Sequence, residues 1–163
     1  MRFKFFGNSE QPPAKAETQS TPKSEPYVPI YKKEQAILNG NFTKQQILNA
    51  MEKEGDVTLQ LAYIAKLKKD KMLDNAAAVF LIQKFNEQTR AERPSKLLLH
   101  SIIDAVVVSD TSGEYKRASL VSMSVSAKDI KGYLSEVTRS EIRTMMELSS
   151  TIQQAIRDPE EKE

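Results

Sequence analysis

The chain of 163 residues contains no cysteine, no tryptophan, a single histidine and only five glycines. Without thiols it has no thiolate nucleophile, no thiolate metal ligand and no disulfide scaffold. A single histidine cannot form a histidine cluster, and five scattered glycines cannot build a dinucleotide- or phosphate-binding loop. The composition therefore predicts a protein without metal, cofactor or small-molecule substrate, and it favours binding or assembly over catalysis.

Long hydrophobic runs are also missing. No stretch approaches the roughly 18 apolar residues of a membrane span, and the apolar start ends at Gly7, short of a signal-peptide core of roughly 7 to 15 residues. The formal net charge is only +2, far from the strong basic field of a nucleic-acid packaging protein. We therefore expect a soluble, intracellular protein.

Residues 1–29 are predicted to be a disordered arm. Residues 8–29 are rich in Pro, Ser, Gln, Glu and Lys, and such a segment buries too little apolar surface to offset its ordering entropy. Two parts of the arm are candidate tethers. The first pairs cations with aromatic rings, as peptides that insert shallowly at an anionic membrane surface do: Arg2, Phe3, Lys4, Phe5 and Phe6. The second is a proline-fixed aromatic segment typical of peptide docking motifs, or of a hinge onto the first helix: Pro26, Tyr27, Pro29 and Tyr31.

Residues 30–158 are predicted to be one compact, mainly α domain of six or seven helices, followed by a charged tail over 159–163. Each helix is recognised by its end signals. Asn39-Gly40 predicts a left-handed end to a short first helix, and Thr43 with Gln46 forms a capping box. Further helix starts are predicted at Asp56, Asp74, Ser95 and Thr138.

The segment from Ala76 to Gln88 begins apolar on nearly all sides, which predicts that it runs through the domain centre, with Phe80 and Ile82 in the core. Residues 105–125 are ambiguous. Val121, Met123 and Val125 alternate with serine as in a β-hairpin, but three- and four-residue spacings also fit helices. The helical surroundings favour helix. The sequence has no internal repeat.

One set of residues resembles a catalytic group. On a helix, His100 and Asp104 lie one turn apart, and Ser101 is adjacent. A serine nucleophile must lie at the distal nitrogen of the histidine, whereas Ser101 is the next helical residue and points elsewhere. We interpret the three residues as a polar helix face, and Asp104 as a solvent-exposed acid rather than a buried one.

Basic residues form a second candidate site. A run of lysines follows one helix, and more cations follow in the next connection; together they would suit phosphate backbones. The alternative is a solvated helix face with i,i+4 pairs to Asp70 and Asp74. The candidate residues for nucleic acid are Lys66, Lys68, Lys69, Lys71, Arg90, Arg93 and Lys96.

Near the C-terminus, apolar residues recur at steps of three, seven and four, close to a two-heptad seam with Ser149 in the remaining position. Two heptads are too few for an independent coiled coil, so the seam must pack on its own domain or complete a homodimer. Packing within the domain is favoured. The seam consists of Ile142, Met145, Ile152 and Ile156.

A basic aromatic start, a Pro-Tyr segment and a helical body together resemble the layout of small viral structural or accessory proteins such as matrix proteins. The likeness is one of layout and names no family. We therefore expect a non-enzymatic interaction or assembly protein whose body binds a protein partner or itself and whose arm tethers it. The alternative is a nucleic-acid-binding helical module that uses the Lys66–Lys71 face.

Overall fold

The computed structural model describes residues 26–161, and their side chains up to Ser150. It confirms a mainly α fold. Within the described residues there are seven α-helices and one 3-10 helix, and no strand. The helices are α2 (Ile30–Asn39), α3 (Lys44–Lys53), α4 (Val57–Lys69), α5 (Asn75–Thr89), α6 (Lys96–Val108), α7 (Gly113–Ser126), η3 (Ala127–Asp129) and α8 (Tyr133–Glu161). Most of the predicted arm lies outside the described residues.

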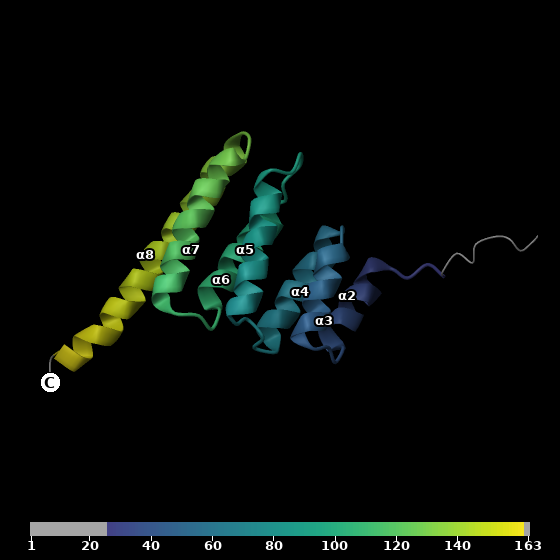
Figure 1. The fold of residues 1–163 in the computed structure, drawn as a ribbon, viewed down its shortest axis with the longest axis horizontal. Coiled ribbons are helices and arrows are strands. Elements are labelled where there is room, and N and C mark those ends of the chain that lie inside the picture. Colours follow the sequence, from purple (N-terminus) through teal and green to yellow (C-terminus); the bar gives the residue numbers. More distant parts are fainter. Residues whose placement is uncertain (1–25, 162–163) are drawn as a thin grey trace, which may run out of the picture.

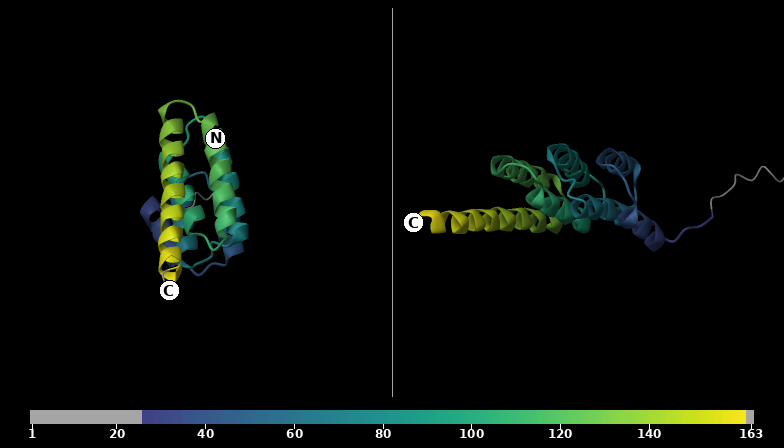
Figure 2. Two further views of the ribbon diagram at one scale, coloured as in Figure 1. Left: turned by 90° about the vertical axis from the view of Figure 1, so that its left-hand side faces the viewer. Right: turned by 90° about the horizontal axis from the view of Figure 1, so that it is seen from below.

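The helices form two layers (Figures 1 and 2). One layer holds α2, α4, α6 and α8, each packed on the next, and the other holds α3, α5 and α7. Three antiparallel hairpins, α3–α4, α5–α6 and α7–α8, therefore stack side by side, with α2 at one end. Among the described residues α2 packs only on α4, so contacts stay between neighbours in the stack as in repeat proteins. The sequence shows no repeat, but the structure repeats one unit.

Predicted helix starts are confirmed where a side chain caps the helix. Thr43 and Gln46 form the capping box. The side chains of Asp56, Asp74 and Ser95 each accept a hydrogen bond from the backbone N–H of the residue three positions later. Ser112 caps α7 in the same way. These bonds satisfy backbone N–H groups that have no partner within the helix.

The helix α2 ends at Asn39 as predicted, but its left-handed ending at Gly40 and the two predicted boundaries of the last helix are wrong. Gly40 has an extended backbone with φ −74°, and the left-handed glycine is instead Gly132, with φ 78°. Gly132 comes just before α8, which begins at Tyr133, so Thr138 is not its cap. The Thr138 side chain is fully buried, because it faces the domain interior. At its other end α8 includes Pro159, where the charged tail was predicted to begin.

Residues 105–125 form the end of α6, a turn over 109–112 and most of α7, and the hairpin alternative is wrong. At 100° per residue, Val121 and Val125 share one helix face and Met123 lies opposite. Met123 is fully buried, whereas Val121 and Val125 are 48% and 58% exposed. The alternation with serine therefore does not reflect a strand.

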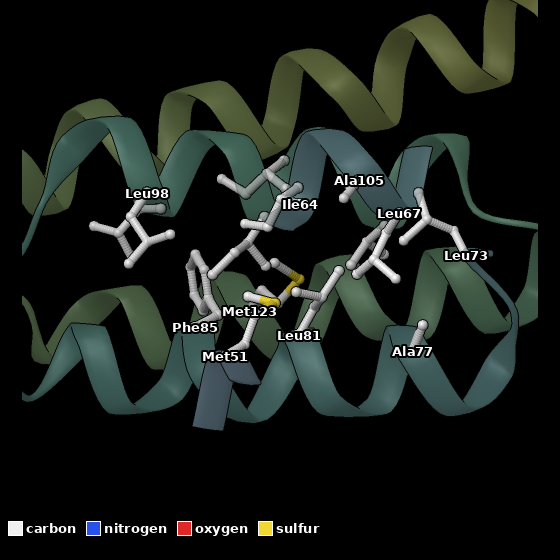
Figure 3. Packing of buried hydrophobic residues seen from close by; sticks show 14 of the residues in the cluster. Met51, Ile64, Leu67, Leu73, Ala77, Leu81, Phe85, Leu98, Ala105 and Met123 are labelled. Atoms are coloured by element: carbon white, nitrogen blue, oxygen red, sulfur yellow. The ribbon is translucent and has the colours of Figure 1, made fainter. Parts of the chain in front are cut away.

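The core lies between the layers, around α5 and α6 (Figure 3). The helix α5 buries one face, with Leu81 and Phe85 inaccessible to solvent, while Val79 is 47% exposed. Phe80 and Ile82 are only half-buried against the core, so their predicted central place is wrong. The reason is that α6 of the other layer covers only the inner face of α5, and no described helix covers its outer face. The fully buried side chains of α6 are Leu98, Leu99, Ile102, Ile103, Ala105 and Val106.

Candidate interaction surfaces

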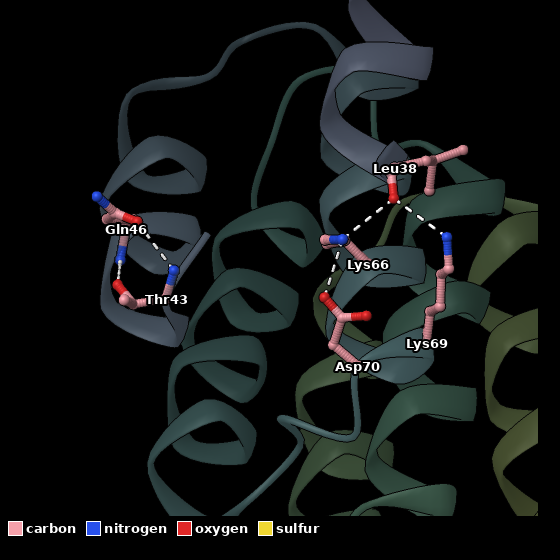
Figure 4. A network of polar contacts seen from close by, with 6 residues as sticks. All are labelled: Leu38, Thr43, Gln46, Lys66, Lys69 and Asp70. Atoms are coloured by element: carbon pink, nitrogen blue, oxygen red, sulfur yellow. Dashed lines mark hydrogen bonds and ion pairs between the residues drawn. The ribbon is translucent and has the colours of Figure 1, made fainter. Parts of the chain in front are cut away.

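Lys66 does not belong to a basic surface. It is 4% exposed, and its Nζ donates to the Leu38 carbonyl at 3.1 Å and pairs with Asp70 at 2.9 Å (Figure 4). Lys69 donates to the same carbonyl at 3.3 Å. Both lysines therefore fasten the end of α2 to α4. The predicted pair between Lys66 and Asp70 is present, but Asp74 pairs with Lys44 instead.

Lys68 is also engaged. Its Nζ lies 2.7 Å from Asp104 Oδ2 and joins α4 to α6. Lys71 is exposed just beyond the end of α4. Of the predicted Lys66–Lys71 face, one lysine is buried, two hold neighbouring helices and one is left at the surface.

The remaining candidate cations lie at the opposite end of α5. Arg90, Arg93 and Lys96 surround the connection from α5 to α6, while Lys71 lies at the connection from α4 to α5 (Figure 1). The fifteen residues of α5 separate the two connections by about 22 Å. Arg90 also faces Asp129 at 3.9 Å. The fold therefore does not join the seven predicted cations into one patch.

His100, Ser101 and Asp104 do not form a catalytic triad. The relay needs both ring nitrogens of the histidine, but His100 Nε2 has no hydrogen-bond partner. Asp104 pairs with Lys68 of α4, and its side chain is 44% exposed. It is therefore a solvent-exposed acid, as predicted.

His100 lies instead in a groove between α6 and the first half of α8. Burial lowers the pKa of the imidazole; Glu141 opposes this shift, and Lys96 adds to it. The other residues that line the groove are Tyr133, Glu136, Val137, Ser140 and Thr144. No sequence signal indicated this groove, because its two sides are more than thirty residues apart.

The predicted seam is divided by the fold. Ile142 is fully buried and Met145 packs against the core, so the first half of the seam lies within the domain. The side chains of Ile152 and Ile156 lie outside the described ones. Only their backbone is described, as part of α8.

The helix α8 extends beyond α7, its partner in the hairpin. It has 29 residues against the 14 of α7, and its end projects beyond the start of α7 (Figures 1 and 2). A small hollow marks the place where α7 begins. Leu120 and Met146 form its apolar part, Ser149 and Ser150 line the α8 side, and Lys116 and Arg117 line the α7 side. Ser119, close by in sequence, is buried.

The docking segment of the arm lies at the other end of the stack, before α2. Tyr27 and Tyr31 are 86% and 61% exposed, and Pro29 directly precedes the helix. Pro26 is also exposed. The membrane-tethering candidates Arg2, Phe3, Lys4, Phe5 and Phe6 lie outside the described residues.

No protein-family model, curated protein or solved structure matches this chain. Among the described side chains, those of residues 26–150, no cluster of His, Asp or Glu could hold a metal ion. In the same part of the chain, no helix is long and apolar enough to cross a membrane. What bears on the function of the chain is therefore the geometry of its exposed surfaces.

Proposed function

We infer that this is a non-enzymatic interaction and assembly protein. Its stack of hairpins contacts a protein partner, or a second copy of itself, and its arm acts as a tether. The observation that carries the proposal is the end of α8, which leaves the stack with no neighbouring helix among the residues that the structure describes. Stacked hairpins are stable because neighbours cover each other, so a helix that leaves the stack offers a surface to another molecule.

Exposed apolar side chains near this end support the proposal. Leu148 on α8 is 52% exposed, and Val121 on α7 is 48% exposed. The layout shared with viral matrix-like structural and accessory proteins is consistent with such a role.

Light scattering of the full chain after size exclusion tests the proposal, with and without RNA. A mass above that of one chain without RNA, retained in high salt, supports assembly through apolar contacts. A mass increase that needs RNA and is lost with salt would favour the nucleic-acid alternative.

A photo-crosslinker at Leu148, with Val79 as the matched exposed control, extends the test to other proteins in the source cells. We expect crosslinked products from position 148 only. A monomeric mass together with no product at position 148 would contradict the proposed function.

A further inference from the structure

One end of the stack carries the connections within the last two hairpins. The α5–α6 connection and the segment between α7 and α8 lie side by side there, and Arg90 faces Asp129 across them at 3.9 Å (Figures 1 and 2). Lys96 and Tyr133 border the same groove, so the starts of α6 and α8 are neighbours as well. We call this surface, formed by residues 90–97 and 127–133, the hairpin edge.

The hairpin edge has an excess of positive charge. Its acids are Glu92 and Asp129, and against its five cations they leave a net charge of +3. Glu136, one turn further along α8, lowers this only to +2. At the opposite end of α6 the connection to α7 holds a single charged residue, Asp110. The exposed cations of the hairpin edge are Arg90, Arg93, Lys96, Lys128 and Lys131.

Two large apolar side chains are exposed beside these cations. Leu97 in the first turn of α6 is 69% exposed, and Tyr133, the first residue of α8, is 82% exposed. Helical side chains lean toward the helix N-terminus, so both lean toward the end of the stack where α6 and α8 begin. Cations beside exposed Leu and aromatic side chains are typical of segments that bind the surface of an anionic membrane.

We propose that the hairpin edge binds the surface of an anionic lipid bilayer. Leu97 and Tyr133 insert among the headgroups, where a ring with a polar hydroxyl is well accommodated, and the five cations contact the lipid phosphates. An aliphatic side chain such as Leu97 cannot stack on a base as an aromatic ring does, which favours a bilayer over a nucleic acid. The edge lies away from the free end of α8, so this inference does not depend on the assembly proposed above.

The neighbouring α3–α4 connection limits the contact to the last two hairpins. It lies at the same end of the stack (Figure 1) and carries Glu54 and Asp56, which with Lys53 give a net charge of −1. An anionic surface repels this charge. We therefore expect the part of the edge formed by α5–α8 to face the bilayer and the α3–α4 corner to point away from it.

Cosedimentation of the full chain with vesicles tests the role of charge. Binding should require phosphatidylserine in phosphatidylcholine vesicles and should weaken in high salt. Arg93→Glu combined with Lys131→Glu should weaken it at least about tenfold. Lys33→Glu combined with Lys71→Glu, the same charge change at exposed positions elsewhere, is the matched control and should weaken it by less than about twofold. An equal loss in both double variants, or binding without phosphatidylserine, would overturn the inference.

Insertion of the edge is tested with a single tryptophan, because the chain has none of its own. The fluorescence of Leu97→Trp should shift to the blue on vesicles with phosphatidylserine and be quenched by brominated acyl chains. Val79→Trp, an exposed change on α5, is the control and should do neither.

Leu97→Ser should weaken vesicle binding at least about fivefold, because the apolar side chain that enters the bilayer is lost, and Val79→Ser should leave it unchanged. All these positions are exposed, so the melting curves of the variants should match that of the wild type. An unquenched tryptophan at position 97, or full binding by Leu97→Ser, would overturn the inference. RNA binding that is lost in the Arg93 and Lys131 double variant would then assign the edge to nucleic acid instead.

Discussion

Lys66 of α4 donates from Nζ to the main-chain carbonyl of Leu38 in α2, 28 positions earlier in the chain, at 3.1 Å. The carbonyl belongs to the last turn of α2, where the helix itself supplies no partner. The ammonium also pairs with Asp70, so a lysine that is 4% exposed has its charge balanced. This contact fastens the end helix of the stack.

Replacing Lys66 should therefore destabilise the domain. Lys66→Met retains the apolar stem but removes the shorter of the two lysine hydrogen bonds to the Leu38 carbonyl and the ion pair with Asp70, and we expect a loss of about 1–3 kcal/mol in the free energy of unfolding. Lys33→Met, an exposed change on α2, is the control and should change it by less than about 0.5 kcal/mol. Urea denaturation followed by circular dichroism measures both. Equal stability of the two variants would show that the buried ammonium contributes nothing.

Lys71 occupies a position that suits glycine. Its φ is 56°, in the left-handed region, and the N–H groups of Lys71 and Met72 bond back to Lys68 and Leu67 at 3.2 and 2.9 Å. This is the Schellman ending of α4, in which a side chain costs about 1–2 kcal/mol.

Lys71→Gly should therefore stabilise the domain by about 0.5–1 kcal/mol, after the greater freedom of glycine in the unfolded chain is deducted. Lys33→Gly, in the right-handed interior of α2, should destabilise by about 1 kcal/mol. Thermal melting of the two variants gives opposite signs if the left-handed backbone is the cause. A lower melting temperature for Lys71→Gly would contradict it.

Phe85 and Phe80 lie on the same helix but differ in burial. Phe85 is fully buried in the core, whereas Phe80 is half-buried and stacks under Lys84, whose Nζ is 5.4 Å from the ring centroid. Phe85→Ala should cost about 3–5 kcal/mol, and Phe80→Ala clearly less because its ring already touches water. Chemical denaturation compares them. A larger loss at Phe80 would place the centre of the fold on the other face of α5.

The stability of the domain should depend on pH through His100. Burial lowers the pKa of the imidazole from its ordinary 6.5, so the unfolded chain binds the proton more readily than the folded one. The free energy of unfolding therefore falls as the pH drops from 6.5 toward the folded-state pKa, and it is insensitive to this group above 6.5.

Denaturation midpoints of the wild type and His100→Gln, measured between pH 7.5 and 5, test this dependence. The wild type should lose more stability than the variant over that range. Asp74 does not interfere, because its hydrogen bond from Lys44 lowers a pKa that is ordinarily 3.8. Parallel curves for the two proteins would contradict the expectation.

Local signals in the sequence predicted the helices well. Thr43, Asp56, Asp74 and Ser95 cap as expected, because each capping bond spans only three residues and depends on few other contacts. The alternating residues around Met123 were harder to interpret, because a strand and a helix both accommodate them. Helical context decided that case correctly.

The sequence by itself determined the helical class of this protein, most of its helix starts and the apolar seam near its end. Only the tertiary structure decided which face of each helix is covered. Lys66 is buried because the end of α2, at Leu38, packs on it. The candidate cations lie apart because the length of α5 separates the two connections that carry them. Ile142 becomes core because α8 packs on α6 and α7, while the same seam leaves the domain where α7 begins. The physical reason is that capping and helical periodicity act within a turn or two, whereas burial depends on contacts between residues far apart in the chain.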